Sequence, residues 1–524
     1  MRAKTKGLSI VTAPALLVAA LMALPISYLI MRAAASGGDA LEIIAQAETV
    51  KILFRTLMLA LSVMLATLAI ALPVAWLTVR TDMPGKKILS VLTALPLVVP
   101  SYVSAIALIS AFGPRGLVQQ MLEEPFGVER LPEIYGFPGA WLALTLSTFP
   151  YLLLTIRGAL MGMDPALEEA SRSLGKGKFV TFVKVTLPHL RPAIAAGGLL
   201  ITLYVLSDFG AVALMGFDSF TRVIFVQFEA AFERTTAIAL SCLLGIFTIG
   251  LVIAEQSARG RARYHSVGAG TQKYPYLAKL GKGRWLAFAF CVFIVLISLG
   301  MPIAVLIYWL SEGLSRNVEV EFPMQAIMNG IYVSGFSALF AIIAAIPVIV
   351  LAVRSPGKLS RTIEVMTWTG FALPGIVVAL SLVFFGINVA TPFYQTLPML
   401  IFAYCVLFLP VATGAVRTSL LQVNPNVEEA SRSLGKTPLR TLLRVTLPMV
   451  APGIIVGAAL VFLTSMKELP ATLMLAPAGF RTLATQLWAA TEAASYTQAA
   501  VPALLLILVS AIPVGLLLYK ERKG

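Results

Sequence analysis

Charged residues are scarce in this chain of 524 residues, since Asp, Glu, Lys and Arg make up 12% of it and hydrophobic residues make up 58%. A soluble domain contains about 25% charged and about 45–50% apolar residues. So few polar side chains cannot cover the surface of a soluble globule, and the abundance of Leu, Ile, Val and Phe excludes a disordered chain. The composition therefore indicates a polytopic protein of the lipid bilayer.

Histidine and cysteine are almost absent, with two and three copies. The histidines lie far apart in the sequence, and Cys242, Cys291 and Cys405 lie in separate apolar runs without a CxxC pair. No cluster of His, Cys or carboxylates has catalytic spacing, which disfavours a membrane enzyme. The phosphate-loop pattern GxxxxGK[ST] is also missing. We therefore expect no catalytic residue, no ATPase activity and no cofactor bound by this chain.

Basic residues exceed acidic ones, giving a net charge of +15. Of the 40 basic residues, 30 lie in one alternating set of loops, as cytoplasmic loops of membrane proteins do, so we expect no nucleic acid partner. Both termini should then be cytoplasmic. A membrane span needs roughly 20 apolar residues. About twelve such segments are predicted, starting near Leu8, Val50, Ile88, Pro138, Arg191, Ala237, Trp285, Gln325, Thr362, Leu397, Ala451 and Gln498.

The chain contains an internal repeat, because residues 168–176 and residues 428–436 both read EEASRSLGK. We predict a first half at 1–258, a cytoplasmic linker at 259–284 and a second half at 285–524. Six spans per half give both repeats the same orientation, related by an axis along the membrane normal. A pathway between the halves is then the expected place for a substrate.

The repeated loops, at about 164–188 and 424–448, each predict a short cytoplasmic helix. Asp164 and Asn424 are N-cap residues followed by proline at the first helical position. The glutamates that follow favour the positive end of the helix dipole. We expect one small or apolar face, from which the charges point away, made up of Leu167, Ala170, Ser171 and Leu174. Two identical loops could merely cap the bundle, but they favour two copies of one partner, each docked on one loop.

These residues carry a family resemblance. The pattern E-A-x3-4-G-x9-[IV]-x-L-P resembles the EAA loop of bacterial ABC importer permeases, with Ser in place of the second Ala in both copies. The resemblance implies that each loop forms a coupling helix for an ATPase. The residues assigned to these loops are Glu168, Glu169, Ala170, Gly175, Leu187 and Pro188, and Glu428, Glu429, Ala430, Gly435, Leu447 and Pro448.

Residues 467–473 (KELPATL) and 208–211 (DFGA) narrow the resemblance to the fused ferric iron permeases, although thiamine and phosphonate permeases are similar. The resemblance implies an all-α fold with a five-helix core per half, each preceded by one extra helix, in the bacterial inner membrane. It also implies two copies of a cytoplasmic ABC ATPase, which use ATP and Mg, and an extracytoplasmic substrate-binding protein.

Ionisable residues within predicted spans are costly and suggest function. Asp208 and Glu468 share the 260-residue offset of the repeat, about seventeen residues into equivalent helices. Together they could offer ferric iron, a hard cation, a transient oxygen site. They could instead form a gate, contact the binding protein or only pack the helices. Lys467 could neutralise one of the carboxylates.

A secondary transporter built from parallel six-helix repeats is the alternative from another class. Ion coupling would require membrane-embedded ionisable groups, and this chain offers few. That class also gives no reason for two identical loops.

Overall fold

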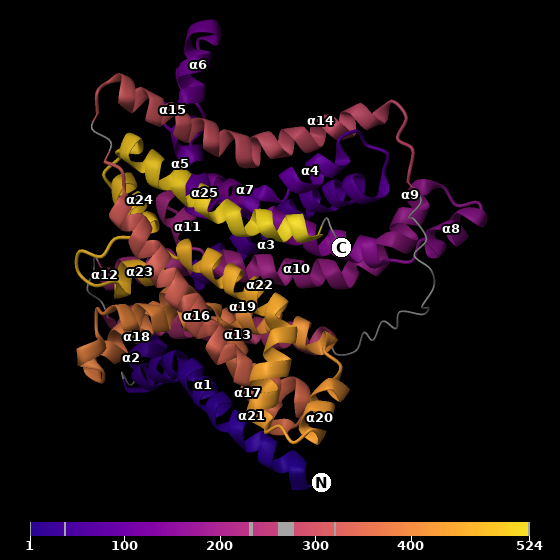
Figure 1. Cartoon of the computed structure of the whole chain (residues 1–524). Helices are drawn as coiled ribbons and strands as arrows, with labels where there is room; N and C mark the ends of the chain where they lie inside the picture. The colour runs from indigo at the N-terminus through magenta and orange to yellow at the C-terminus, as the bar shows by residue number, and fades with distance from the viewer. Residues whose placement is uncertain (1, 36–37, 230–233, 260–276, 319–320, 522–524) are drawn as a thin grey trace. The chain divides into compact units, whose positions relative to one another are not determined.

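The computed structural model describes residues 2–35, 38–229, 234–259, 277–318 and 321–521, and most of the predicted linker 259–284 lies outside them. Ten helices within these ranges are long and apolar enough to cross a membrane, and two shorter apolar helices are Gly375–Asn388 and Tyr496–Ile512. This all-α architecture (Figure 1) confirms a polytopic membrane protein with about twelve apolar segments.

The two halves follow a similar order of elements, although α2 of the first half has no counterpart among the described residues of the second. The first half contains α1 (Arg2–Ala35), α2 (Asp39–Ala45), α3 (Ala47–Arg80), α4 (Lys86–Leu92), α5 (Ser101–Phe112), α6 (Leu117–Phe126), α7 (Phe137–Gly162), α8 (Pro165–Ser173), α9 (Lys178–Thr181), α10 (Leu187–Ser207), α11 (Gly210–Leu214), α12 (Phe220–Glu229) and α13 (Arg234–Arg259). The second contains α14 (Gly283–Val295), α15 (Met301–Ser315), α16 (Met324–Arg354), α17 (Lys358–Ala372), α18 (Gly375–Asn388), α19 (Leu397–Gln422), α20 (Pro425–Ser433), α21 (Pro438–Thr441), α22 (Leu447–Met466), α23 (Pro470–Leu475), α24 (Leu483–Glu492) and α25 (Tyr496–Glu521).

The third and ninth predicted segments, which start near Ile88 and Thr362, each contain a break between two helices. In the first half, α4 is followed by a 3₁₀ turn (Leu95–Val98) and then by α5, which begins after Pro100. In the second half, α17 ends before Pro374 and α18 begins after it. Val99 and Leu373, which precede these prolines, are extended, with ψ of 117° and 127°. Proline disfavours helical backbone in the preceding residue, which explains both breaks.

The chain forms two compact units that do not coincide with its two halves. One unit comprises residues 1–49, 223–249 and 318–524, and the other comprises residues 50–222 and 250–317. The first helix of each half therefore packs on core helices of the other half (Figure 1).

Specific contacts hold these exchanged helices within their units. In the unit that contains α1, Ser381 of α18 donates a 2.6 Å hydrogen bond to the carbonyl of Pro25. Ala15 and Ala19 of α1 pack with buried side chains of α16 and α17. In the other unit, the indole N–H of Trp309 in α15 donates to the hydroxyl of Ser110 in α5. Alanines allow these helices to approach closely, as small residues do in membrane proteins.

Candidate functional site

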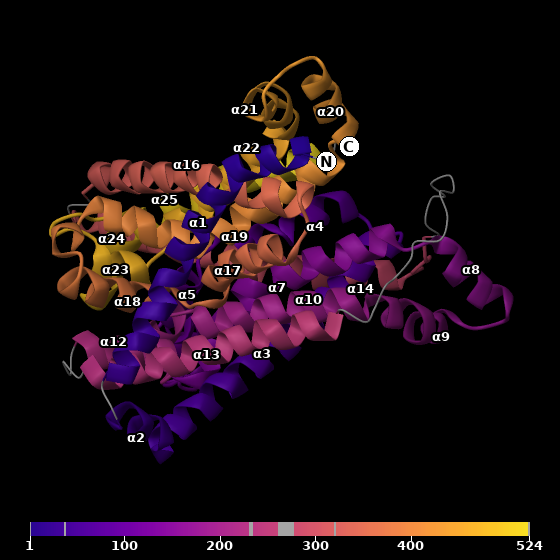
Figure 2. The same cartoon turned by 90° about the horizontal axis from the view of Figure 1, so that it is seen from below.

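The two repeated loops form the short helices that the sequence predicts. α8 and α20 each contain nine residues and begin with proline. The side chain of Asp164 accepts a 2.9 Å hydrogen bond from the N–H of Ala166, and Asn424 accepts one of 3.0 Å from Asn426. These contacts confirm both predicted N-caps. Figure 2 shows α8 and α9 projecting beyond the ends of α7 and α10.

Each loop helix ends at a glycine and leads into a π-helical turn. Gly175 and Gly435 have φ of 76° and 80°, the left-handed backbone that commonly ends helices. The turns Phe182–Thr186 and Leu442–Thr446 follow, and both precede a Leu-Pro pair. Proline lacks the N–H that would continue an α-helical ladder. Single π-turns occur frequently at functional sites.

Adjacent glutamates in each loop helix face opposite ways. The first of each pair is buried, as Ser171 is, which corrects the expectation that the charges point away from the face that contains Ser171. Glu169 and Glu429 are exposed, whereas Glu168 and Glu428 are only 7% and 6% exposed. Each buried carboxylate accepts a hydrogen bond from a threonine of the π-turn, at 2.8 Å from Thr186 and 3.0 Å from Thr446.

A pair of hydroxyl groups forms a second contact between each loop helix and the segment that follows it. Ser171 lies 3.0 Å from Thr181, and Ser431 lies 3.1 Å from Thr441, all four being buried. The serine at the third EAA position therefore has a partner that alanine would lack. Together with the buried glutamate, it fastens the loop helix to the segment that follows.

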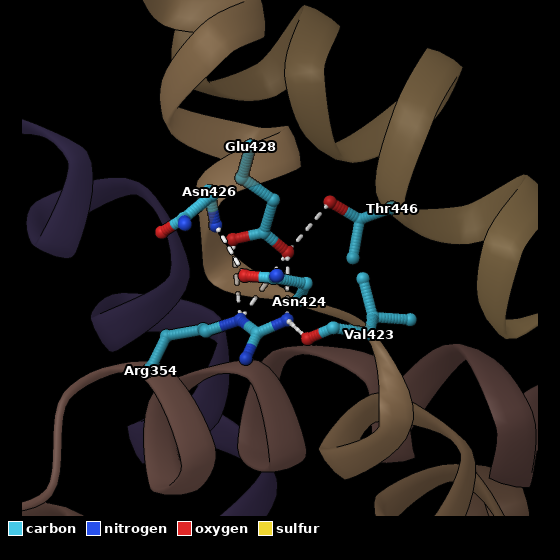
Figure 3. A network of polar contacts seen from close by, with 6 residues as sticks. All are labelled: Arg354, Val423, Asn424, Asn426, Glu428 and Thr446. Carbon is cyan, nitrogen blue, oxygen red and sulfur yellow. Dashed lines mark hydrogen bonds and ion pairs between the residues drawn. The ribbon is translucent and has the colours of Figure 1, made fainter.

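Arg354, the last residue of α16, joins this arrangement in the second half (Figure 3). Its Nε lies 3.2 Å and 3.1 Å from the two carboxylate oxygens of Glu428, and its Nη2 lies 3.1 Å from Oε1. The same Nη2 donates to the carbonyl of Val423, which follows α19. Sequence reasoning missed Arg354, because 74 residues separate it from Glu428. A clue was that Arg354 and Arg80 both occur seven residues after a proline.

Exposed apolar side chains cover the outer side of both loops. Leu174 and Leu434, directly before the terminal glycines, are 78% and 81% exposed. Leu167 and Val427 are exposed as well. Of the residues predicted to share one face, Leu167 and Leu174 are therefore exposed, whereas Ser171 is buried. Two apolar side chains therefore lie exposed on each of these otherwise polar, charged loop helices.

Asp208 lies at a helix break rather than inside a continuous helix, contrary to expectation. α10 ends at Ser207, and α11 begins at Gly210. The Asp208 carboxylate accepts hydrogen bonds from the Ser101 hydroxyl and, at 3.0 Å, from the N–H of Ala211. It therefore lies at the N-terminal ends of α5 and α11, where helix dipoles favour negative charge.

Glu468 occupies the equivalent break between α22 and α23. Its Oε1 accepts a 3.2 Å hydrogen bond from the N–H of Ala471, and its backbone carbonyl accepts one of 2.6 Å from Thr472. Lys467 is the C-cap of α22, where the helix dipole favours a cation. The structure thus gives both predicted carboxylates a local bonding role within their own units.

The residue at the start of the neighbouring helix differs between the two breaks. Ser101 begins α5, and Gly375 begins α18 at the equivalent place after a proline. A Cβ atom built at Gly375 would lie 2.6 Å from Oε1 of Glu468. The longer Glu468 therefore faces glycine, whereas the shorter Asp208 faces serine. Among the described residues, no group of three or more His, Cys, Asp and Glu side chains could hold a metal ion.

Two helical repeats across a membrane, each with a short loop helix and a helix break beside a carboxylate, define a polytopic membrane permease. The family described as "Binding-protein-dependent transport system inner membrane component" matches residues 68–259 and again residues 337–523. The chain belongs to this family. It is therefore a multi-pass permease subunit of the inner membrane.

Known relatives agree with this assignment. The chain is 36% identical over 502 residues to the Fe(3+)-transport system permease protein FbpB 2 of Haemophilus influenzae, covering 95% of each chain. It is 24% identical to a putative ferric transport system permease of the same organism, covering 84% of this chain and 72% of that one. The sulfate transport system permease CysT of Escherichia coli is 29% identical over 47% of this chain and 91% of its own length.

Proposed function

We propose that this chain is the membrane pathway of an ATP-driven importer for ferric iron, which an extracytoplasmic binding protein delivers. The similarity to the Fe(3+)-transport permease over 95% of both chains supports this substrate. The family description supports the binding protein. The two halves, divided near residues 259–284, would flank the pathway.

Both termini and both loop helices lie in the cytoplasm in this proposal, because most basic residues share their side. One ATPase docks on α8 and a second on α20, and the ATPases rather than this chain use ATP and Mg. The observation that carries the proposal is the pair of exposed leucines, Leu174 and Leu434, at equivalent ends of helices of identical core sequence.

Asp208, Lys467 and Glu468 serve this pathway as parts of a gate. The carboxylates bond to the helices that begin at the breaks, so they hold the positions of α11 and α23. Their bonded oxygens favour this role over transient ligation of ferric iron.

The test is to express the chain with its ATPase and binding protein, purify it in mild detergent and place it in liposomes. Leu174→Asp combined with Leu434→Asp should abolish retention of the ATPase, because each charge would replace an apolar contact. Phe126→Asp is the matched control. Phe126 is 74% exposed on α6, beyond the opposite end of α7, a helix of 26 residues or about 39 Å.

Two ATPases per chain and ATP-dependent uptake of ferric iron are the expected results. Retention of the ATPase by the double leucine variant, measured by quantitative mass spectrometry, would refute the docking sites. Uptake of molybdate or sulfate, but not of iron, would refute the substrate while leaving the importer class in place. Uptake that follows an ion gradient without ATP would favour the secondary transporter.

A further inference from the structure

The two loop helices have the same core sequence but different ties to the transmembrane helices. Residues 168–176 and 428–436 are identical, and both buried glutamates accept a hydrogen bond from the π-turn threonine. The difference lies in the arginine that ends the long helix of each half, Arg80 in α3 and Arg354 in α16.

In the second half, this arginine connects four segments. The Arg354 guanidinium binds both carboxylate oxygens of Glu428 in α20 and the carbonyl of Val423 at the end of α19 (Figure 3). Glu428 in turn holds Thr446 in the turn before α22. The side chains of Arg354 and Glu428 are 17% and 8% exposed, so water screens the pair weakly.

In the first half, the equivalent arginine has no carboxylate partner among the residues that the structure describes. Nη2 of Arg80 donates to the carbonyls of Leu160 and Met163, at 3.0 Å and 3.4 Å. Nε of Arg80 is buried and lacks a hydrogen-bond partner. Met163 and Val423 are related by the 260-residue offset of the repeat. Both arginines therefore donate to an equivalent backbone carbonyl, but only Arg354 also forms an ion pair among the described residues.

We propose that Arg354 and Glu428 form a latch that fixes the coupling helix α20 to α16, whereas α8 has no such tie to α3. Bidentate arginine–carboxylate pairs fix geometry as well as adding binding energy. Movement of α20 would therefore move α16, while α8 could tilt independently of α3. The two ATPases would thus act on the transmembrane helices through two contacts of unequal rigidity. This inference rests on the proposed docking of ATPases at these helices.

Hydrogen exchange of the purified permease in lipid nanodiscs, without ATPase, tests the latch by itself. Because each amide and the residue before it are the same, the amides of 169–173 and 429–433 have the same intrinsic exchange, so any difference between them reports structure. We expect slower exchange in α20 by about ten- to a hundredfold, the factor that corresponds to a charge-assisted hydrogen bond. Glu428→Gln should remove this difference, and Glu168→Gln should leave exchange in α8 unchanged.

Arg354→Lys provides a second variant should Glu428→Gln assemble poorly, because it keeps the charge but loses the two-pronged contact. The exchange rate of the α20 amides in Arg354→Lys should lie between the rate in the unsubstituted chain and the rate in Glu428→Gln. Equal exchange of α8 and α20 in the unsubstituted chain would overturn the latch.

The coupling role has its own measurement, ferric iron imported per ATP hydrolysed by the full complex in liposomes. Glu428→Gln should lower this ratio more than Glu168→Gln does. An equal loss in the two variants would overturn unequal coupling even where exchange differs. Failure of the ATPase to bind the unsubstituted chain would refute the proposed function instead, while the exchange result would still decide whether the latch exists.

Discussion

Gly375→Ser should destabilise the protein, because Gly375 faces Glu468 at the second helix break. The added Cβ would lie 2.6 Å from Oε1 of Glu468 and 3.3 Å from Cγ of Pro470. Neighbours this close must shift, and overpacking in a buried site costs about 1–3 kcal/mol. Glu468→Asp alone should cost less than about 1 kcal/mol, because Asp208 at the equivalent break reaches the N–H of Ala211, three residues on, at 3.0 Å.

The double variant, Gly375→Ser with Glu468→Asp, should recover much of this loss. It recreates the first half, where the Ser101 hydroxyl donates to the Asp208 carboxylate. Residues in direct contact commonly show coupling energies of about 0.5–3 kcal/mol. We expect favourable coupling of about 1–2 kcal/mol, which places the double variant above Gly375→Ser in stability.

Apparent melting temperatures of the purified chain, taken in one detergent at one scan rate, measure this order. The reciprocal pair, Ser101→Gly with Asp208→Glu, is the matched control in the other compact unit and should show coupling of the same sign. If the decreases in melting temperature of the single variants simply add in both double variants, the two side chains at each break are independent, and the predicted coupling is refuted.

Two further predictions concern the carboxylates and the loop glycines. Asp208→Asn with Glu468→Gln should lower transport while leaving assembly intact, because the amides keep an acceptor for the capped helix but lose the charge; unchanged uptake in liposomes would contradict a gate. Gly175→Ala and Gly435→Ala should each cost about 1 kcal/mol and weaken ATPase retention, since both glycines have positive φ. Gly158→Ala, in open space within α7, should not destabilise, and an equal loss there would count against the backbone explanation.

Local features of the loops could be predicted from the sequence because neighbouring residues determine them. Asp164 and Asn424 cap their helices, and Gly175 and Gly435 end them, as their spacing indicated. The internal repeat and the apolar segments could also be predicted, because both are patterns of residues along the chain.

Features that depend on distant residues could not be predicted in this way. The pair Arg354 and Glu428 arises where the end of α16 meets α20, and no periodicity marks that meeting. The breaks before α5 and α18 lie in apolar stretches whose composition suits an uninterrupted span, and Pro100 and Pro374 were local signals of a break. The roles of Asp208 and Glu468 depend on which helix begins beside them, which the offset of the repeat does not reveal.

The exchange of first helices sets the order in which the chain can complete its folding. α1 leaves the ribosome long before α16, α17 and α18, on which it packs and which end only at Asn388. The other unit is also completed late, because it comprises residues 250–317 as well as residues 50–222. Neither half synthesised alone would contain a whole unit, so two separate chains cut at the linker would have to find each other before either became stable. Fusion into one chain keeps the helices that are synthesised later at high local concentration around the helices that are already in the bilayer.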